Sequence, residues 1–181
     1  MTHRLPSTLR ARFTVVMALL CLAVTLHAQT PDWKTYSYPA DGFSASFPSA
    51  PEMTKKAVDT KVGPVELRSY IVTEGDTALF VGIADYRPQD ITRTPDELLQ
   101  GAKNGALQNA KAHLLSEAKI TLGIYQGLEF ESESDEAHFS ARIYFVGHSL
   151  YQTLVAIPLG QPYANTGRFL DSFQIIARTT E

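Results

Sequence analysis

The chain has 181 residues with 16 basic and 19 acidic side chains, which gives a formal net charge of −3. An acidic chain without a basic cluster argues against nucleic acid as a partner, because nucleic-acid binding depends on lysine and arginine releasing counterions. The length suffices for one domain with a sizeable core.

The first 28 residues have the organisation of a secretory signal peptide. Three arginines precede an apolar run at residues 13–26, and Ala28 places a small residue before Gln29. The run would form a helix of about 21 Å, which is short of the roughly 30 Å hydrocarbon core of a bilayer. We therefore expect residues 1–28 to be a cleaved export signal, with an uncleaved membrane anchor as the alternative.

Cleavage would change the chemistry of the remaining chain. Cys21 is the only cysteine, and it lies inside the apolar run rather than at the cleavage point, which argues against lipidation. The predicted mature domain, residues 29–181, retains 13 basic and 19 acidic residues, a net charge of −6. It would have no disulfide and no cysteine nucleophile. We expect a periplasmic or extracellular protein with a single globular domain.

Before residue 92 the sequence alternates strand-like runs with turns. The expected strands are 33–38, 43–47, 55–60, 64–73 and 78–86. In the second of them Phe43, Ala45 and Phe47 fall on one face. The run 78–86 is apolar at nearly every position, so we expect it in the middle of a sheet with both faces covered.

A helix is predicted from Pro95 to about Ala112. Thr94 and Glu97 have the spacing of a capping box, with proline at the first helical position. Apolar and small residues then recur at spacings of three and four, which indicates a face that packs closely on a sheet.

The second half of the chain repeats the strand pattern and ends in a helix. The expected strands are 114–122, 125–134, 137–147, 149–157 and 173–177, with a helix at 163–172. Consecutive strands joined by tight turns favour antiparallel pairing, so the predicted class is α+β.

Several strings along the chain resemble the PsbP/Mog1-like superfamily, which includes bacterial exported members. They are residues 38–48, 127–130, 141–147, 150–152 and 169–173. The resemblance implies an α/β/α sandwich, with a mainly antiparallel sheet of about seven strands and helices on both faces. It also implies an accessory, chaperone or partner-binding module rather than an enzyme. It transfers no catalytic or cofactor-binding residues.

The histidines of the domain do not predict a metal or catalytic site. His113, His138 and His148 are separated by 25 and 10 residues, which matches no metal-binding motif. Glu129, Glu131 and Glu133 alternate along a strand, so their carboxylates would line one face, where a calcium ion could bridge them. A solvated strand face is the simpler interpretation, and we predict no metal.

No nucleophile motif is present. The sequence has no Gly-x-Ser-x-Gly elbow, and the glycines at 123 and 127 lack the lysine of a phosphate loop. We therefore predict no catalytic residue and no cofactor.

Three aromatic residues near the mature N-terminus, Trp33, Tyr36 and Tyr38, form the candidate partner surface. The leading hypothesis is an exported non-catalytic domain that binds another envelope protein, with the membrane involved only through an uncleaved leader. Two alternatives stay open. One is a small-ligand or metal-binding module of the envelope, and the other is a hydrolase with a dispersed active site.

Overall fold

The computed structural model describes residues 32–60, 63–88 and 93–179. The predicted leader, residues 1–28, lies outside them. The elements in chain order are β1 (Lys34–Tyr38), β2 (Phe43–Phe47), β3 (Glu52–Thr60), β4 (Gly63–Glu74), β5 (Thr77–Asp85), α1 (Pro95–Ala110), β6 (His113–Leu122), β7 (Tyr125–Glu133), β8 (Ala137–Val146), β9 (Ser149–Pro158), α2 (Thr166–Ser172) and β10 (Gln174–Ile175). Within these described stretches, no helix is long and apolar enough to cross a membrane.

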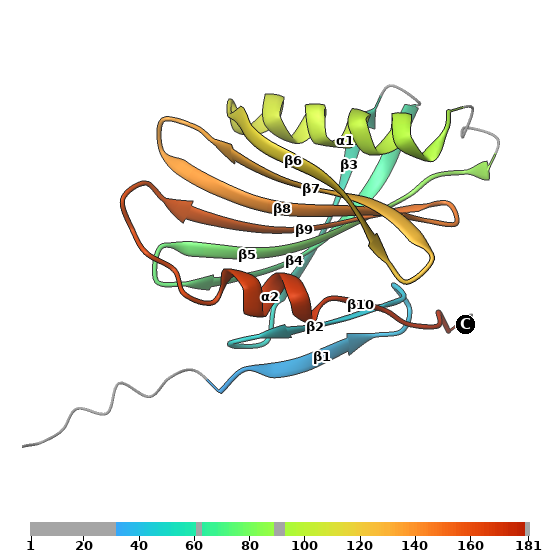
Figure 1. The fold of residues 1–181 in the computed structure, drawn as a ribbon. Helices are drawn as coiled ribbons and strands as arrows, with labels where there is room; N and C mark the ends of the chain where they lie inside the picture. Colours follow the sequence, from blue (N-terminus) through green and yellow to red (C-terminus); the bar gives the residue numbers. More distant parts are fainter. Residues whose placement is uncertain (1–31, 61–62, 89–92, 180–181) are drawn as a thin grey trace, which may run out of the picture. The chain divides into compact units, whose positions relative to one another are not determined.

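Seven strands form one antiparallel sheet in the order β3-β4-β5-β9-β8-β7-β6 (Figure 1). Its two halves are runs of consecutive strands, because tight turns join antiparallel neighbours directly. The β5–β9 pair joins the halves, with Leu79 opposite Val155 and Ile83 opposite Tyr151. The predicted α+β class and antiparallel pairing are confirmed.

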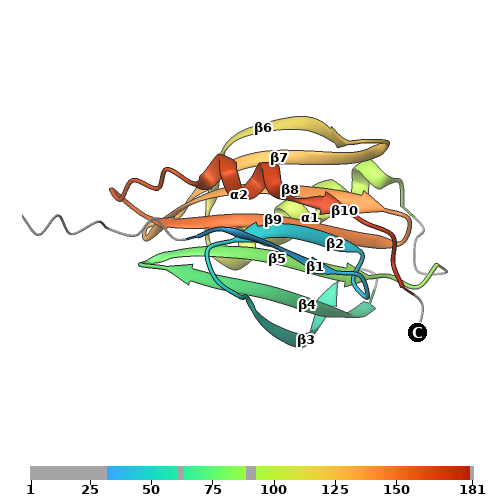
Figure 2. The same cartoon turned by 90° about the horizontal axis from the view of Figure 1, so that it is seen from below.

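β1, β2 and β10 form a second, three-stranded sheet. Phe43 of β2 lies between Tyr38 of β1 and Ile175 of β10, so the first and last strands of the domain flank the same strand. Figure 2 shows this small sheet over the large one. The predicted sheet of about seven strands is confirmed, and this small sheet is present in addition to it. Alternating residues predict β2 as a strand, but they do not reveal that its partner comes from the far end of the chain.

The start of α1 follows its capping residues. The backbone N–H of Thr94 donates to the carboxylate of Glu97 at 2.8 Å, and the N–H of Glu97 donates to the Thr94 hydroxyl at 3.3 Å. The helix ends at Ala110, before the predicted Ala112, because Lys111 adopts a left-handed conformation with φ of 51°.

α2 is shorter than predicted and begins at Thr166 rather than at Tyr163. Tyr163 is engaged elsewhere, since its hydroxyl donates to Glu74 at 2.5 Å and its carbonyl accepts from the Thr166 hydroxyl at 3.3 Å. These bonds hold residue 163 in the turn that precedes the helix.

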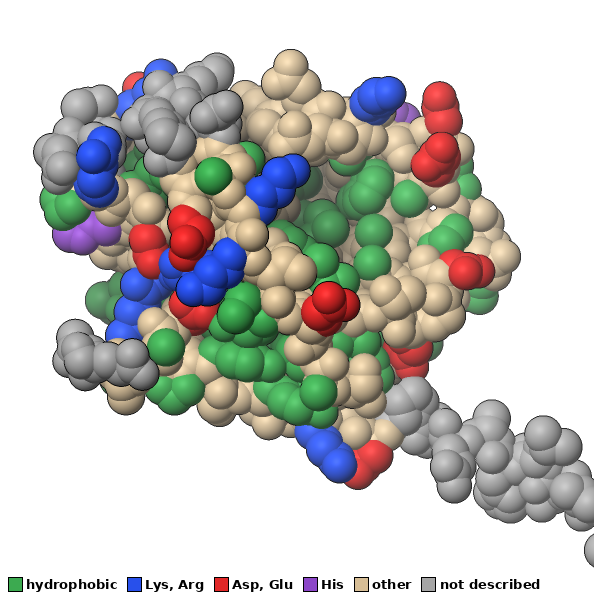
Figure 3. All heavy atoms as spheres, turned by 180° about the vertical axis from the view of Figure 1, so that it is seen from behind, with side chains coloured by type: hydrophobic (Ala, Val, Ile, Leu, Met, Phe, Trp, Pro, Cys, Tyr) green, Lys and Arg blue, Asp and Glu red, His purple; other side chains and the backbone are tan. Residues whose placement is uncertain are grey.

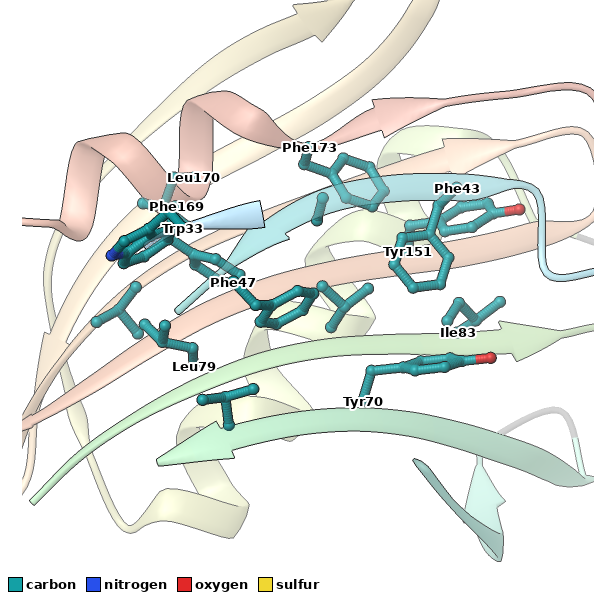
Figure 4. Packing of buried hydrophobic residues seen from close by; sticks show 14 of the residues in the cluster. Trp33, Phe43, Phe47, Tyr70, Leu79, Ile83, Tyr151, Phe169, Leu170 and Phe173 are labelled. Atoms are coloured by element: carbon teal, nitrogen blue, oxygen red, sulfur yellow. The ribbon is translucent and has the colours of Figure 1, made fainter. Parts of the chain in front are cut away.

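The two faces of the large sheet carry different layers (Figures 1 and 2). α1 packs over β7 and β8, whereas α2 and the small sheet pack on the opposite face. Helices on both faces confirm the predicted sandwich. The core beneath the small sheet is rich in aromatic rings (Figure 4), and it includes Trp33, Phe43, Phe47, Tyr70, Leu79, Val81, Ile83, Tyr151, Phe169 and Phe173. The core beneath α1 is smaller and consists of Leu99, Leu128, Phe130, Ala141, Ile143 and Leu150.

β5 lies inside the sheet, as its apolar run predicts, but its two faces are covered unequally. Leu79, Val81 and Ile83 are fully buried beneath the small sheet. On the other face Phe80 stays half-buried, and its ring folds over Gly82, where an added Cβ would meet it at 2.5 Å. The expected covering of both faces is thus complete beneath the small sheet and partial on the α1 side.

Candidate functional site

A cleft opens beside α1, on the sheet face that this helix only partly covers. One wall is the helix itself, and the other is formed by Val58, Tyr86, Leu150 and Gln152. The cleft has a volume of about 360 Å³, which falls within the usual range of ligand pockets, roughly 300–1,000 Å³.

The lining combines buried apolar groups with exposed amides. Leu98 and Leu150 are buried beneath the cleft, at 8% and 9% exposure. The exposed amide side chains at its rim are Asn104, Gln108 and Asn109, and Gln152 of the opposite wall is half-buried. Amides both donate and accept hydrogen bonds, so they match the peptide groups of an extended chain. Burial raises the pKa of the Tyr86 phenol.

α1 turns two glycines toward the cleft. A Cβ added at Gly101 or Gly105 would meet no other atom within 4 Å, so close packing inside the chain does not account for them. Each costs about 1 kcal/mol of helix stability relative to alanine. The predicted close packing of small residues applies instead to Ala102 and Ala106, which contact the core beneath the helix. The glycines leave a flat wall that a ligand backbone can approach.

The same sheet face continues beyond the cleft as an apolar row. Ile71 lies opposite Phe80, and Phe80 lies opposite Leu154, so the three side chains run across β4, β5 and β9. Ile71 is 37% exposed, and the other two are half-buried. Figure 3 shows hydrophobic side chains gathered in a hollow on this side of the molecule.

At one end of the sheets an interlayer ion cluster joins the small sheet to the large one. Its members are Asp41, Arg68, Tyr70, Asp85, Ser149, Tyr151 and Arg178. Arg68 donates to Asp41 and to Asp85, both at 2.5 Å. Tyr70 also donates to Asp41, and the Tyr151 hydroxyl donates to the Asp41 carbonyl at 2.8 Å. Asp41 stands in the β1–β2 turn, so these bonds fix that turn on the large sheet.

The C-terminal segment enters the same cluster through Arg178. Its guanidinium donates to Asp85 at 2.9 Å, to Ser149 at 3.1 Å and to Tyr151 at 3.0 Å. Gly42 makes this approach possible, since its φ is +73° and an added Cβ would lie 2.7 Å from Arg178 Cγ. The cluster thus fastens both ends of the domain to the large sheet.

The charges of the ion cluster stabilise one another. Burial opposes ionisation of Asp85, but hydrogen bonds from Arg178, Ser149 and Arg68 outweigh it and lower its pKa to about 2. Burial and the bond to Asp41 raise the pKa of Tyr70, so its phenol remains a donor. With two cations facing two carboxylates, this arrangement holds the layers together.

The candidate partner surface at the N-terminus lies against the main core. Trp33 is only 9% exposed, and the Arg168 guanidinium lies 4.9 Å from its ring centroid. Its indole Nε1 is buried and has no hydrogen-bond partner within the described residues. Tyr36 and Tyr38 are half-buried against the same core. Partner binding by Trp33, Tyr36 and Tyr38 stays a prediction.

The three histidines lie apart from one another. His113 is exposed at the start of β6, and His148 is exposed in the β8–β9 turn. His138 lies on β8, where its Nε2 is 2.7 Å from Glu131. In the ranges that the structure covers, no three histidine, cysteine or acidic residues are grouped so as to hold a metal ion.

The carboxylates of β7 share one face, as their alternation predicts, but basic residues of β8 lie opposite them. Glu129 accepts from Arg142 at 2.5 Å. Glu131 and Glu133 flank His138, at 2.7 and 3.7 Å. The row is therefore a set of cross-strand polar contacts, of which Glu129–Arg142 is an ion pair.

Sequence reasoning missed both the cleft and the ion cluster. A sign of the cluster was present, because Arg68 shares a strand face with the buried residues Tyr70 and Val72. A charged residue on a face that enters a core requires a buried partner. The sequence gives a weaker sign of the cleft in Gly101 and Gly105. Both glycines lie within a helix, although no neighbouring group would prevent a larger side chain there.

These layers define a PsbP-like fold: a seven-stranded antiparallel sheet with α1 on one face and α2 with the small sheet on the other. Among solved structures, the chain is similar to the solution structure of cyanobacterial PsbP (CyanoP) from Synechocystis sp. PCC 6803, with a TM-score of 0.51 and 17% sequence identity. The match covers 80% of this chain and 93% of that chain. No family model and no curated protein matches the sequence. The likeness shows the fold, and it confirms the fold that the sequence strings predicted.

Proposed function

We propose that the chain is an exported, non-catalytic accessory domain that binds an extended segment of another envelope protein in the cleft beside α1. The cleft carries this proposal, because it joins a buried apolar floor to exposed amides and to two glycines that leave room for a peptide backbone. The lining extends along the helix from Glu97 to Asn109, about 18 Å at 1.5 Å per residue. An extended segment of about five residues spans that length.

Site-specific photo-cross-linking tests the partner and its place together. A photoreactive residue at Asn104, on the rim of the cleft, is compared with one at Ser37, which is exposed on β1. We expect a discrete protein adduct in envelope extracts from position 104 alone. Gly105→Trp fills the cleft and should abolish it, whereas Ile124→Trp, at a side chain that is 89% exposed, should not. Adducts from position 37 alone would place the partner on the N-terminal aromatic residues.

Export and the absence of catalysis have separate tests. The intact mass of the exported protein should correspond to a chain that begins at Gln29, and retention of residues 1–28 would favour the anchor. Turnover of ester, peptide or glycoside substrates that survives re-purification would contradict the non-catalytic role.

The volume of the cleft also favours a second candidate function, the binding of a small ligand. Native mass spectrometry of the purified exported chain distinguishes the two. A bound non-protein mass that is absent from Gly105→Trp, without a cross-linked protein at Asn104, would support this alternative.

A further inference from the structure

β6 is a free edge of the large sheet. It is last in the strand order, and within the described residues it pairs only with β7. Residues 113–119 of this strand are all exposed. The backbone N–H and C=O groups on the outer side of such a strand can pair with another strand.

The opposite edge of the sheet is built differently. β3 carries consecutive lysines, Lys55 and Lys56, which place positive charge on both faces of the exposed strand. Lysines of this kind oppose edge-to-edge pairing. On β6 the charges instead alternate in sign, since Glu117 and Lys119 lie on one face with Ala118 between them on the other.

We propose that β6 pairs antiparallel with β6 of a second copy of this chain, with Ala118 at the two-fold axis. This register sets Glu117 of each copy opposite Lys119 of the other, and Ser116 opposite Ile120. In an antiparallel pair, two residues that lie opposite one another have side chains on the same face of the sheet. When the two strands are identical, the two-fold axis must therefore pass midway between one residue and its own copy.

The charges select this register over its neighbours. An axis at Glu117 would place two glutamates directly opposite each other, and an axis at Lys119 would do the same with two lysines. Like charges at opposed positions destabilise a strand pair, whereas opposite charges stabilise it. The bulge between Leu114 and Ser116 ends the regular part of the strand, and the proposed pairs from Ser116 to Ile120 lie beyond it.

Contacts within each copy extend the charge pattern. Glu117 already accepts from Lys103, and Lys119 lies 2.7 Å from Asp96, both on α1. In the pair, four charged side chains would follow one another in space on each side of the two-fold axis. They are Asp96 and Lys119 of one copy, then Glu117 and Lys103 of the second copy. The signs alternate along this series of ion pairs.

Single cysteines test the register in the full chain, in a Cys21→Ser background. Ala118→Cys should give a disulfide-linked dimer under mild oxidation, because the two cysteines would face each other across the axis. Ala57→Cys is the matched control, an exposed alanine on the other edge strand. Equal cross-linking of both variants, or of neither, would overturn the proposal.

Sedimentation equilibrium tests the charges without a cross-link. Lys119 is 75% exposed, so Lys119→Glu should fold normally and should weaken the dimer about tenfold, since two attractive pairs become repulsive. Lys56→Glu, the same change on β3, should leave it unaffected. A wild-type chain that stays monomeric at all concentrations would also overturn the proposal. The pairing does not depend on the cleft, so either proposal can fail alone.

Discussion

The two faces of the large sheet are covered in different ways, and the difference separates stability from binding. Beneath the small sheet, Phe43, Phe47, Phe169 and Phe173 are fully buried among other aromatic rings. Beneath α1 the core is smaller, and Phe80 on the same sheet face is only half-buried. Buried apolar area stabilises the fold in proportion to its size. The aromatic face therefore holds the domain together, while the α1 face keeps apolar surface available.

Polar groups follow the same division. On the aromatic face Asp41, Arg68, Asp85 and Arg178 are bonded to one another, and their bonds join the two sheets. On the α1 face the amide residues line an open cleft. A satisfied network adds rigidity, whereas exposed donors and acceptors remain free for a ligand.

The largest expected effect comes from removing an aromatic ring of the main core. The Phe43 ring lies 5.0 Å from Tyr38 and 5.9 Å from Phe173, between centroids, and Phe43 has no exposed surface. Phe43→Ala should lower the free energy of unfolding by about 3–5 kcal/mol in urea titrations, because it leaves a cavity. Leu99→Ala beneath α1 should cost about 2 kcal/mol. A larger loss from Leu99→Ala would contradict the division between the faces.

A smaller effect is expected from acid. The pKa of Asp85 is lowered from 3.8 to about 2 in the folded chain, so its ionised form stabilises the fold at neutral pH. That contribution is complete above the unfolded pKa and is lost as pH falls from about 4 through about 2. The side chain is 36% exposed, so solvent screening reduces the contribution to about 1 kcal/mol.

The variant Asp85→Asn separates the contribution of Asp85 to stability from the contributions of the other carboxylates. Thermal melts between pH 2 and pH 7 should show a loss of stability at neutral pH and a shallower acid dependence than wild type. Asp76→Asn, in the exposed β4–β5 turn, is the control. An unchanged acid slope in Asp85→Asn would exclude Asp85 as a source of the pH dependence.

Local patterns in the sequence predicted most elements of the fold. Capping by Thr94 and Glu97 fixed the start of α1, and the alternation of Phe43 to Phe47 fixed β2. These features depend on residues a few positions apart. The pairing of β2 with β10 and the bonds from Arg178 to Asp85 join distant parts of the chain, so no local pattern contains them. The cleft likewise depends on how far α1 covers the sheet, which no short stretch of sequence determines.

The smallest effect is expected at Gly105, where one replacement should change stability and binding in opposite directions. Gly105→Ala should stabilise the fold by about 0.5–1 kcal/mol, since alanine is the better helix former and its Cβ meets nothing within 4 Å. The same methyl group enters the cleft and should weaken the adduct formed from Asn104. Urea titration and cross-linking yield measure the two effects. A glycine that served only the fold would give destabilisation on replacement, so a less stable Gly105→Ala would contradict the binding role. Greater stability with a reduced yield would show that the α1 face gives up stability to remain open.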